Sequence, residues 1–127
     1  MNSMYDELMK TYHEVVGTGY CDSQREAYEK TVNHPAPRYY VNARWACQVI
    51  SPLLEGDMTA LKKLSQLKQE MYLSLLHEVI EISSQRNFIG RSPYYVVQFA
   101  IHRPAPRFFI SAETMRKIFH RKKYDFK

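Results

Sequence analysis

The chain has 127 residues, 45% of them apolar and 24% charged, which is the ordinary balance of a globular protein that forms one compact domain or two half-size units. No run of about 18 apolar residues occurs, so the sequence excludes a membrane-spanning helix. The net charge of +5 arises from residues 103–127, which hold eight basic and two acidic residues, because residues 1–102 hold ten basic and eleven acidic ones.

The first predicted elements are two helices. Ser3, with an acidic residue three positions later, is typical of a helix cap, and apolar residues follow it at helical spacing. Gly17 ends this helix. Ser23 caps a second helix, which stops before Pro35 because proline lacks a backbone donor and forces the preceding residue into extended geometry.

A strand and a third helix are predicted next. Residues 38–41 are rich in β-forming side chains, so they predict a short strand. Asn42 caps a helix whose apolar residues keep a helical period up to Leu54. Pro52 lies inside this pattern, and we expect it to kink or shorten the helix.

The second part of the chain predicts the same order of elements. Residues 59–83 have the period of one long helix. Ser92 and Pro93 then begin a helix over residues 94–101, although the propensity of these residues alone favours a strand. Residues 107–110 predict a second strand, and Ser111 caps a last helix.

The two parts share a motif as well as an order. Pro35-Ala36-Pro37-Arg38 recurs as Pro104-Ala105-Pro106-Arg107, and in both copies two aromatic residues, a β-branched residue, a capping residue and alanine follow. The His-Glu pair at 13–14 also recurs, at 77–78, and the slightly different offset fits a short insertion in the second copy. We therefore predict an internal duplication, with repeats of about 1–56 and 57–127 within a single domain.

The predicted fold class is mainly α with a small ribbon. Two strands of four residues cannot each satisfy their own backbone groups, so the simplest arrangement pairs them. We expect Arg38–Val41 and Arg107–Ile110 to form a two-stranded antiparallel ribbon across a pseudo-twofold axis. The helices of both repeats, each of the pattern helix–helix–strand–helix, would pack around this ribbon.

The residue types that catalysis or metal binding requires are not arranged in a recognisable pattern. The His13-Glu14 and His77-Glu78 pairs lack the second histidine of a zinc-protease motif. Cys21 and Cys47 are isolated, and no glycine-rich phosphate loop or nucleophile elbow occurs. We expect no enzyme, no cofactor and no metal. The acidic N-terminus lacks an export signal, so a cytoplasmic protein with reduced cysteines is expected.

Two groups of basic residues are candidates for contacts with nucleic-acid phosphates. The first lies on the last helix and just after it: Arg116, Lys117, Arg121, Lys122 and Lys123. The alternative is a solvated helix end whose cations complement the helix dipole. The second group is Arg38 and Arg107, which stand beside aromatic residues. For these two, the alternative is a packing role in a proline-stiffened turn.

Three aromatic residues predict a different kind of partner. Tyr94, Tyr95 and Phe99 lie on the outward side of the second repeat's middle helix, where the first repeat has charged residues. Aromatic side chains on such a face either pack under the long helix or form a protein interface, with a second copy or another protein. A protein-interaction or structural subunit is therefore the alternative function.

The repeated segment resembles a motif of one group of bacterial proteins. The order Pro-Ala-Pro-Arg, two aromatic residues, Val or Ile, Asn or Ser, and Ala at 35–43 and 104–112 is similar to a motif in short uncharacterised proteins of gut Bacteroidetes. The resemblance covers these segments and not the whole chain. It lends no catalytic or binding residues, and it implies an accessory, mobile-element or phage-linked origin.

Overall fold

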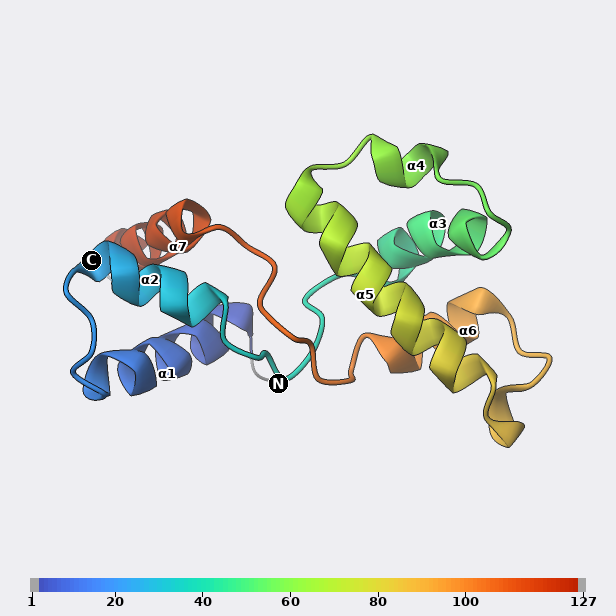
Figure 1. Cartoon of the computed structure of the whole chain (residues 1–127), viewed down its shortest axis with the longest axis horizontal. Coiled ribbons are helices and arrows are strands. Elements are labelled where there is room, and N and C mark those ends of the chain that lie inside the picture. The colour runs from blue at the N-terminus through green and yellow to red at the C-terminus, as the bar shows by residue number, and fades with distance from the viewer. Residues whose placement is uncertain (1–2, 126–127) are drawn as a thin grey trace. The chain divides into compact units, whose positions relative to one another are not determined.

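The computed structural model describes residues 3–125, and it describes side chains as far as Arg121. This part of the chain is mainly helical, as predicted, with seven α-helices and one short 3₁₀ helix (Figure 1). In chain order they are α1 (Met4–Gly17), α2 (Gln24–Val32), α3 (Ala43–Leu54), α4 (Thr59–Lys62), α5 (Gln66–Ser83), η1 (Arg86–Phe88), α6 (Pro93–Ala100) and α7 (Ala112–Asp125).

Helix starts follow the predicted caps, because each capping side chain accepts a hydrogen bond from a backbone N–H of the first turn, which has no partner within the helix. These side chains belong to Ser3, Ser23, Asn42, Ser92 and Ser111. The prediction of a helix over 94–101 is confirmed by α6, in spite of its strand propensity. Tertiary packing of an amphipathic helix outweighs propensity at this position.

The predicted long helix over 59–83 is wrong in its first turns. It is divided into α4 and α5 by a break at residues 63–65. Ser65 has an extended backbone, and its hydroxyl accepts a hydrogen bond from the N–H of Lys68 at 3.4 Å. A serine cap therefore starts α5 at this point, and the apolar period that continues across the break concealed it from the sequence.

The predicted ribbon is wrong: neither Arg38–Val41 nor Arg107–Ile110 is a strand in the described structure. The backbone N–H of Tyr39 donates to the carbonyl of Ile101 at 2.8 Å, and that of Phe108 donates to the carbonyl of Val32 at 3.1 Å. Both acceptors lie at the C-terminal ends of helices, whose last carbonyls have no partner within the helix. The segments therefore complete helix ends, and no ladder between two strands is needed.

The segments around the two prolines have the same local structure. Residues 33–42 and 102–111 agree position by position in their pattern of turns and bends, with one isolated β-bridge residue at Ala36 and another at Ala105. One difference is Phe109, whose φ of 59° lies in the left-handed region that non-glycine residues seldom adopt. A backbone of this kind costs about 1–3 kcal/mol, so packing must hold Phe109 in place.

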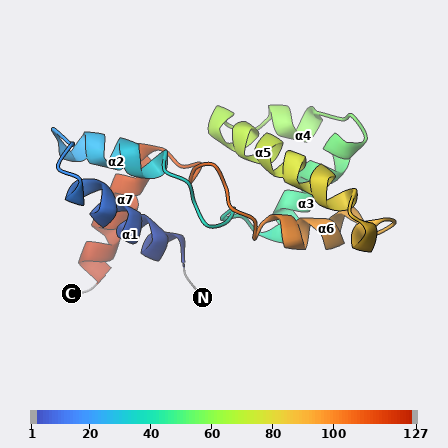
Figure 2. The ribbon, with the colours of Figure 1, turned by 60° about the horizontal axis from the view of Figure 1, so that its bottom comes forward.

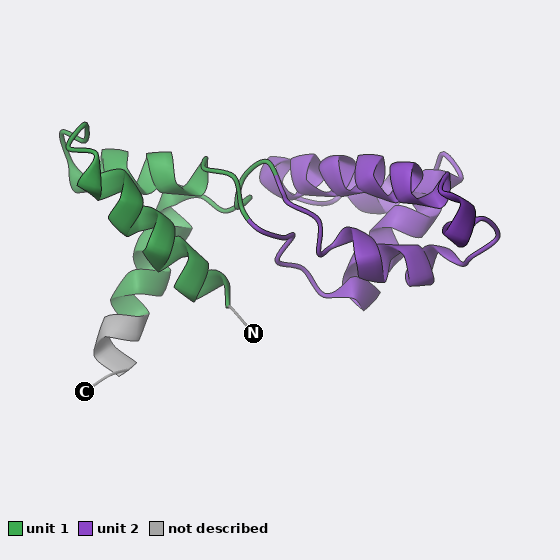
Figure 3. Cartoon of the chain, turned by 90° about the horizontal axis from the view of Figure 1, so that it is seen from below, with its two compact units in different colours: residues 1–36, 106–127 green, residues 37–105 purple. Residues whose placement is uncertain are grey.

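The described chain divides into two compact units (Figure 3). Unit 1 comprises the described part of residues 1–36 and 106–127, and unit 2 comprises residues 37–105. Unit 1 therefore contains α1, α2 and α7, and unit 2 contains α3 to α6 (Figure 2). These bounds differ from the predicted repeats, since each unit takes its third long helix from the other repeat.

Unit 1 is a three-helix unit in which α2 packs against both α1 and α7. Its core holds the buried side chains of Leu8, Val15 and Met115. The rings of Tyr12, Tyr28 and Phe119, with that of Tyr5, form a cluster in which Phe119 meets the other three edge to face, with centroids 5.6–5.8 Å apart. Edge-to-face pairs of this kind stabilise a core beyond the burial of area.

Unit 2 is built around α5 and α6, against which α3 packs. Leu75 and Val79 of α5, Ile50 of α3 and Val97 of α6 are fully buried. The phenol of Tyr39, in the segment that leads into α3, forms a 2.6 Å hydrogen bond with the hydroxyl of Ser74 on α5. This bond satisfies the one polar atom of an otherwise buried side chain.

Candidate functional site

The basic face of α7 is one candidate site. Arg116, Lys117, His120 and Arg121 are exposed along the helix. The guanidinium of Arg116 binds both carboxylate oxygens of Glu113, at 2.6 and 3.2 Å. This hydrogen bond lowers the pKa of Glu113 and raises that of Arg116. Lys117 and Arg121 form no ion pair among the described residues. Lys122 and Lys123, which were also predicted to contact phosphates, have side chains outside the described part of the structure.

The fold changes how the positive charge is distributed. The basic segment at the end of the chain belongs to the same unit as the acidic start of the chain. Residues 1–36 and 106–127 together hold ten basic and eight acidic residues, and residues 37–105 hold eight and five. The charge excess that the sequence concentrates at one end is therefore shared almost evenly between the units, and what remains is a local basic face on α7.

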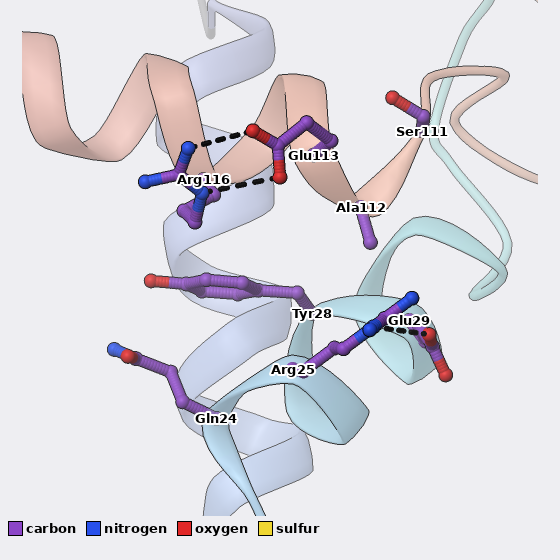
Figure 4. Close-up of a pocket in the computed structure, with 8 residues that line it drawn as sticks. All are labelled: Gln24, Arg25, Tyr28, Glu29, Ser111, Ala112, Glu113 and Arg116. Carbon is purple, nitrogen blue, oxygen red and sulfur yellow. Dashed lines mark hydrogen bonds and ion pairs between the residues drawn. The ribbon is translucent and has the colours of Figure 1, made fainter.

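A cavity of about 520 Å³ lies between α2 and α7 (Figure 4). Figure 4 shows the Tyr28 side chain of α2 between the Glu113–Arg116 pair on α7 and the other labelled residues of α2. Among these, Arg25 forms an ion pair with Glu29 at 3.4 Å. The residues that line the cavity are Gln24, Arg25, Tyr28, Glu29, Ser111, Ala112, Glu113 and Arg116.

The wall of this cavity is mostly apolar surface, and it also carries four charged side chains. Two arginines and two carboxylates balance each other in its wall. Burial raises the pKa of the Tyr28 phenol, with a smaller contribution from Tyr12, so the phenol stays protonated at neutral pH. The sequence pointed to Arg116 alone among these residues. Arg25 and Glu113 lie in opposite halves of the chain, and no pattern in the sequence joins them.

The two arginines of the repeated motif pack against rings in the same way. The guanidinium of Arg38 lies 5.6 Å from the ring centroid of Tyr40, and that of Arg107 lies 5.8 Å from that of Phe109. The Nε of Arg38 also donates to the carbonyl of Tyr39 at 3.3 Å. Both side chains are half-buried. This geometry favours the packing role of these arginines over phosphate binding, which stays a prediction.

The aromatic residues of α6 form an exposed cluster. Tyr95 and Phe99 are 37% and 46% exposed, and their rings contact each other and that of Phe88, with centroids 5.1–5.9 Å apart. The guanidinium of Arg91 lies 5.0 Å from the Tyr95 centroid. Tyr94, at 45%, is exposed as well. The buried face of α6 is formed instead by Val96, Val97 and Ala100.

The His-Glu pairs and the cysteines, the other residues considered for catalysis or metal binding, have contacts that serve the fold. Glu78, from the second His-Glu pair, accepts a hydrogen bond from Arg103 at 3.0 Å, and Glu81 lies 3.4 Å from the same guanidinium. Burial raises the pKa of the Cys47 thiol, which disfavours the reactive thiolate. Within the described residues, His, Cys, Asp and Glu side chains form no group of three or more that could hold a metal ion.

None of the described helices has both the length and the apolar character needed to cross a membrane. Comparison of the chain with protein-family models, with curated proteins and with solved structures found no match.

Proposed function

We propose that the chain is a small non-enzymatic binding protein whose helix α7 contacts the phosphates of nucleic acid. The observation that supports this function is the exposed pair Lys117 and Arg121, which lie one helical turn apart and take part in no ion pair among the described residues. Phosphate contacts of this kind position a protein on nucleic acid without reading its sequence.

Arg116 has a different part in this proposal. Its guanidinium is held by Glu113 on the same helix, so it is oriented but partly neutralised. A phosphate would have to compete with that carboxylate. Lys117 and Arg121 therefore provide most of the attraction, and the binding is expected to be weak, salt-dependent and insensitive to base sequence.

Neutralising the exposed pair tests the function. The double replacement Lys117→Gln and Arg121→Gln is expected to weaken binding to two unrelated DNA duplexes equally. The slope of log K against log salt is expected to fall by about 1.8, since each lost phosphate contact removes about 0.9. Fluorescence anisotropy across a salt series measures both quantities.

A matched control separates a site from a general charge effect. Lys62, the last residue of α4 in unit 2, and Lys63, which follows it, are both exposed. Replacing both by glutamine also removes two positive charges from the chain. This control is expected to leave the affinity and the slope nearly unchanged. Equal losses in both variants, or no loss in either, would show that α7 is not a phosphate-binding face.

A second candidate function is supported by the exposed cluster of Phe88, Tyr95 and Phe99. Three aromatic rings in mutual contact, of which those of Tyr95 and Phe99 are exposed, are typical of a protein interface, because tyrosine and phenylalanine are enriched in such interfaces. In this proposal the partner is either another protein or a second copy of the chain. Tyr94 extends the surface along α6.

Replacing Tyr95 and Phe99 by serine tests this alternative. Both side chains are exposed, so we expect the helical content to be kept while concentration-dependent association is lost. Sedimentation velocity over a range of concentrations measures the association. The pair Tyr20→Ser and Trp45→Ser, which removes two other exposed aromatic side chains, is the control. A wild-type chain that stays monomeric at all concentrations would contradict self-association.

We also propose that the two halves of the chain derive from one duplicated unit. The matching turns at 33–42 and 102–111 support this origin, as does burial at equivalent positions of the first long helices. Leu8, Thr11 and Val15 are buried in α1, and so are the residues at the corresponding positions of α5, Tyr72, Leu75 and Val79.

A further inference from the structure

The third helix of each half packs in the unit that contains the first two helices of the other half. Helix α7 follows α5 and α6 in the sequence, yet it packs against α1 and α2. Helix α3 follows α1 and α2, yet it packs against α5 and α6. Neither half of the chain therefore contains all three helices of a unit.

The hydrogen bonds after the prolines show the same exchange. The N–H of Tyr39 donates to Ile101, and the N–H of Phe108 donates to Val32. The offset from Tyr39 to Phe108 equals that from Val32 to Ile101, and both equal the offset between the two copies of the motif. The same hydrogen bond is therefore formed at two equivalent places, and each time it joins one half of the chain to the other. If each half folded independently, Tyr39 would pair with Val32 and Phe108 with Ile101.

The exchanged helices supply parts of both cores. Met115 of α7 is fully buried in unit 1, and Ala46 and Ile50 of α3 are fully buried in unit 2. Removing either helix would expose the apolar face on which it packs. Each half therefore carries an apolar surface that fits one partner, the third helix of the other half.

We propose that each half donates one helix and accepts another, so that the halves form a stable one-to-one complex without the peptide link between α3 and α4. The acceptor surfaces are the face of α1 and α2 that α7 covers and the face of α5 and α6 that α3 covers. The kind of partner that fits them is another copy of the repeat, so this inference rests on the duplication proposed above. Helix exchange between identical elements is a known route to dimers, and here one chain holds both copies.

Cutting the folded chain between α3 and α4 tests the proposal. Residues 54–59 are exposed, so a protease site inserted after Gly56 is expected to be tolerated. After cleavage, fragments 1–56 and 57–127 are expected to elute together at the mass of the intact insertion variant at micromolar concentration. Size-exclusion chromatography with light scattering measures the mass, and circular dichroism the helical content.

A matched pair of replacements locates the association. In the cut chain, Met115→Asp buries a carboxylate in unit 1 and is expected to weaken the complex by about 100-fold or more. Lys117→Asp, on the exposed face of the same helix, is expected to change it by less than about threefold. Fragments that separate although the uncut insertion variant is folded would overturn the proposal and leave the duplication standing. Equal effects of the two replacements would overturn it as well, because α7 would then not be the donated helix.

Discussion

Replacing Met115 with alanine is expected to lower the free energy of unfolding of unit 1 by about 2–5 kcal/mol. The side chain is fully buried where α7 packs in unit 1. Alanine removes the apolar atoms and leaves a cavity that a close-packed three-helix core can fill only in part. Alanine also has a high helix propensity, so α7 itself is not weakened, and the loss reports the packing of this helix.

The destabilisation is expected to be confined to the helices of unit 1. Native-state hydrogen exchange is expected to show faster exchange in α1 and α2, which lie at the other end of the sequence from α7, and unchanged exchange in α5 and α6. The control is Met58→Ala, which removes the same atoms from a side chain that is 44% exposed, and it is expected to change stability by less than about 1 kcal/mol. Faster exchange in α5 and α6 with unchanged α1 and α2 would contradict the assignment of α7 to unit 1.

Replacing Leu75 with alanine is expected to destabilise unit 2 by a comparable amount, about 2–5 kcal/mol. Leu75 is fully buried on α5, which packs against both α3 and α6. Because α3 depends on this face for its burial, its amides are expected to exchange faster together with those of α5 and α6. Those of α1 and α2, which lie in unit 1, are expected to keep their protection.

The same helix provides a closely matched control. Leu73 lies near Leu75 on α5 and is 45% exposed, so Leu73→Ala deletes the same atoms outside the core. We expect a change of less than about 1 kcal/mol, with unaltered exchange in α3. Chemical denaturation monitored by circular dichroism measures both free energies. Similar losses for Leu73 and Leu75 would show that α3 does not cover the inner face of α5.

Local features of the fold could be predicted from the sequence because they depend on residues a few positions apart. The caps at Ser23, Asn42 and Ser92 bond to N–H groups two or three residues later. The apolar period defined the buried faces of most helices. The basic face of α7 could be predicted for this reason too. The outward position of Tyr95 and Phe99 followed from their alignment with charged residues of the first repeat.

The wrong predictions concern which backbone groups a segment bonds to, and where one helix ends and the next begins. The segments after the prolines have strand propensity, but a helix end offers free carbonyls, and the backbone of Tyr39 bonds to Ile101 there. The apolar period also runs across the break before Ser65, so it could not show where α5 begins. Propensity gives a preference for each segment, and the partner that is available in space decides the outcome.

By itself, the sequence determined the helical class, the starts of most helices and the matching turns of the two proline segments, because each of these depends on contacts along a short stretch of chain. Only the tertiary structure decided that α7 packs with α1 and α2, that Arg25 lies across a cavity from Glu113, and that the basic end of the chain shares a unit with its acidic start. These features join residues from opposite ends of the sequence. Their pairing is selected by the burial of whole helix faces, and an apolar stripe shows that a face is buried without showing which helix covers it.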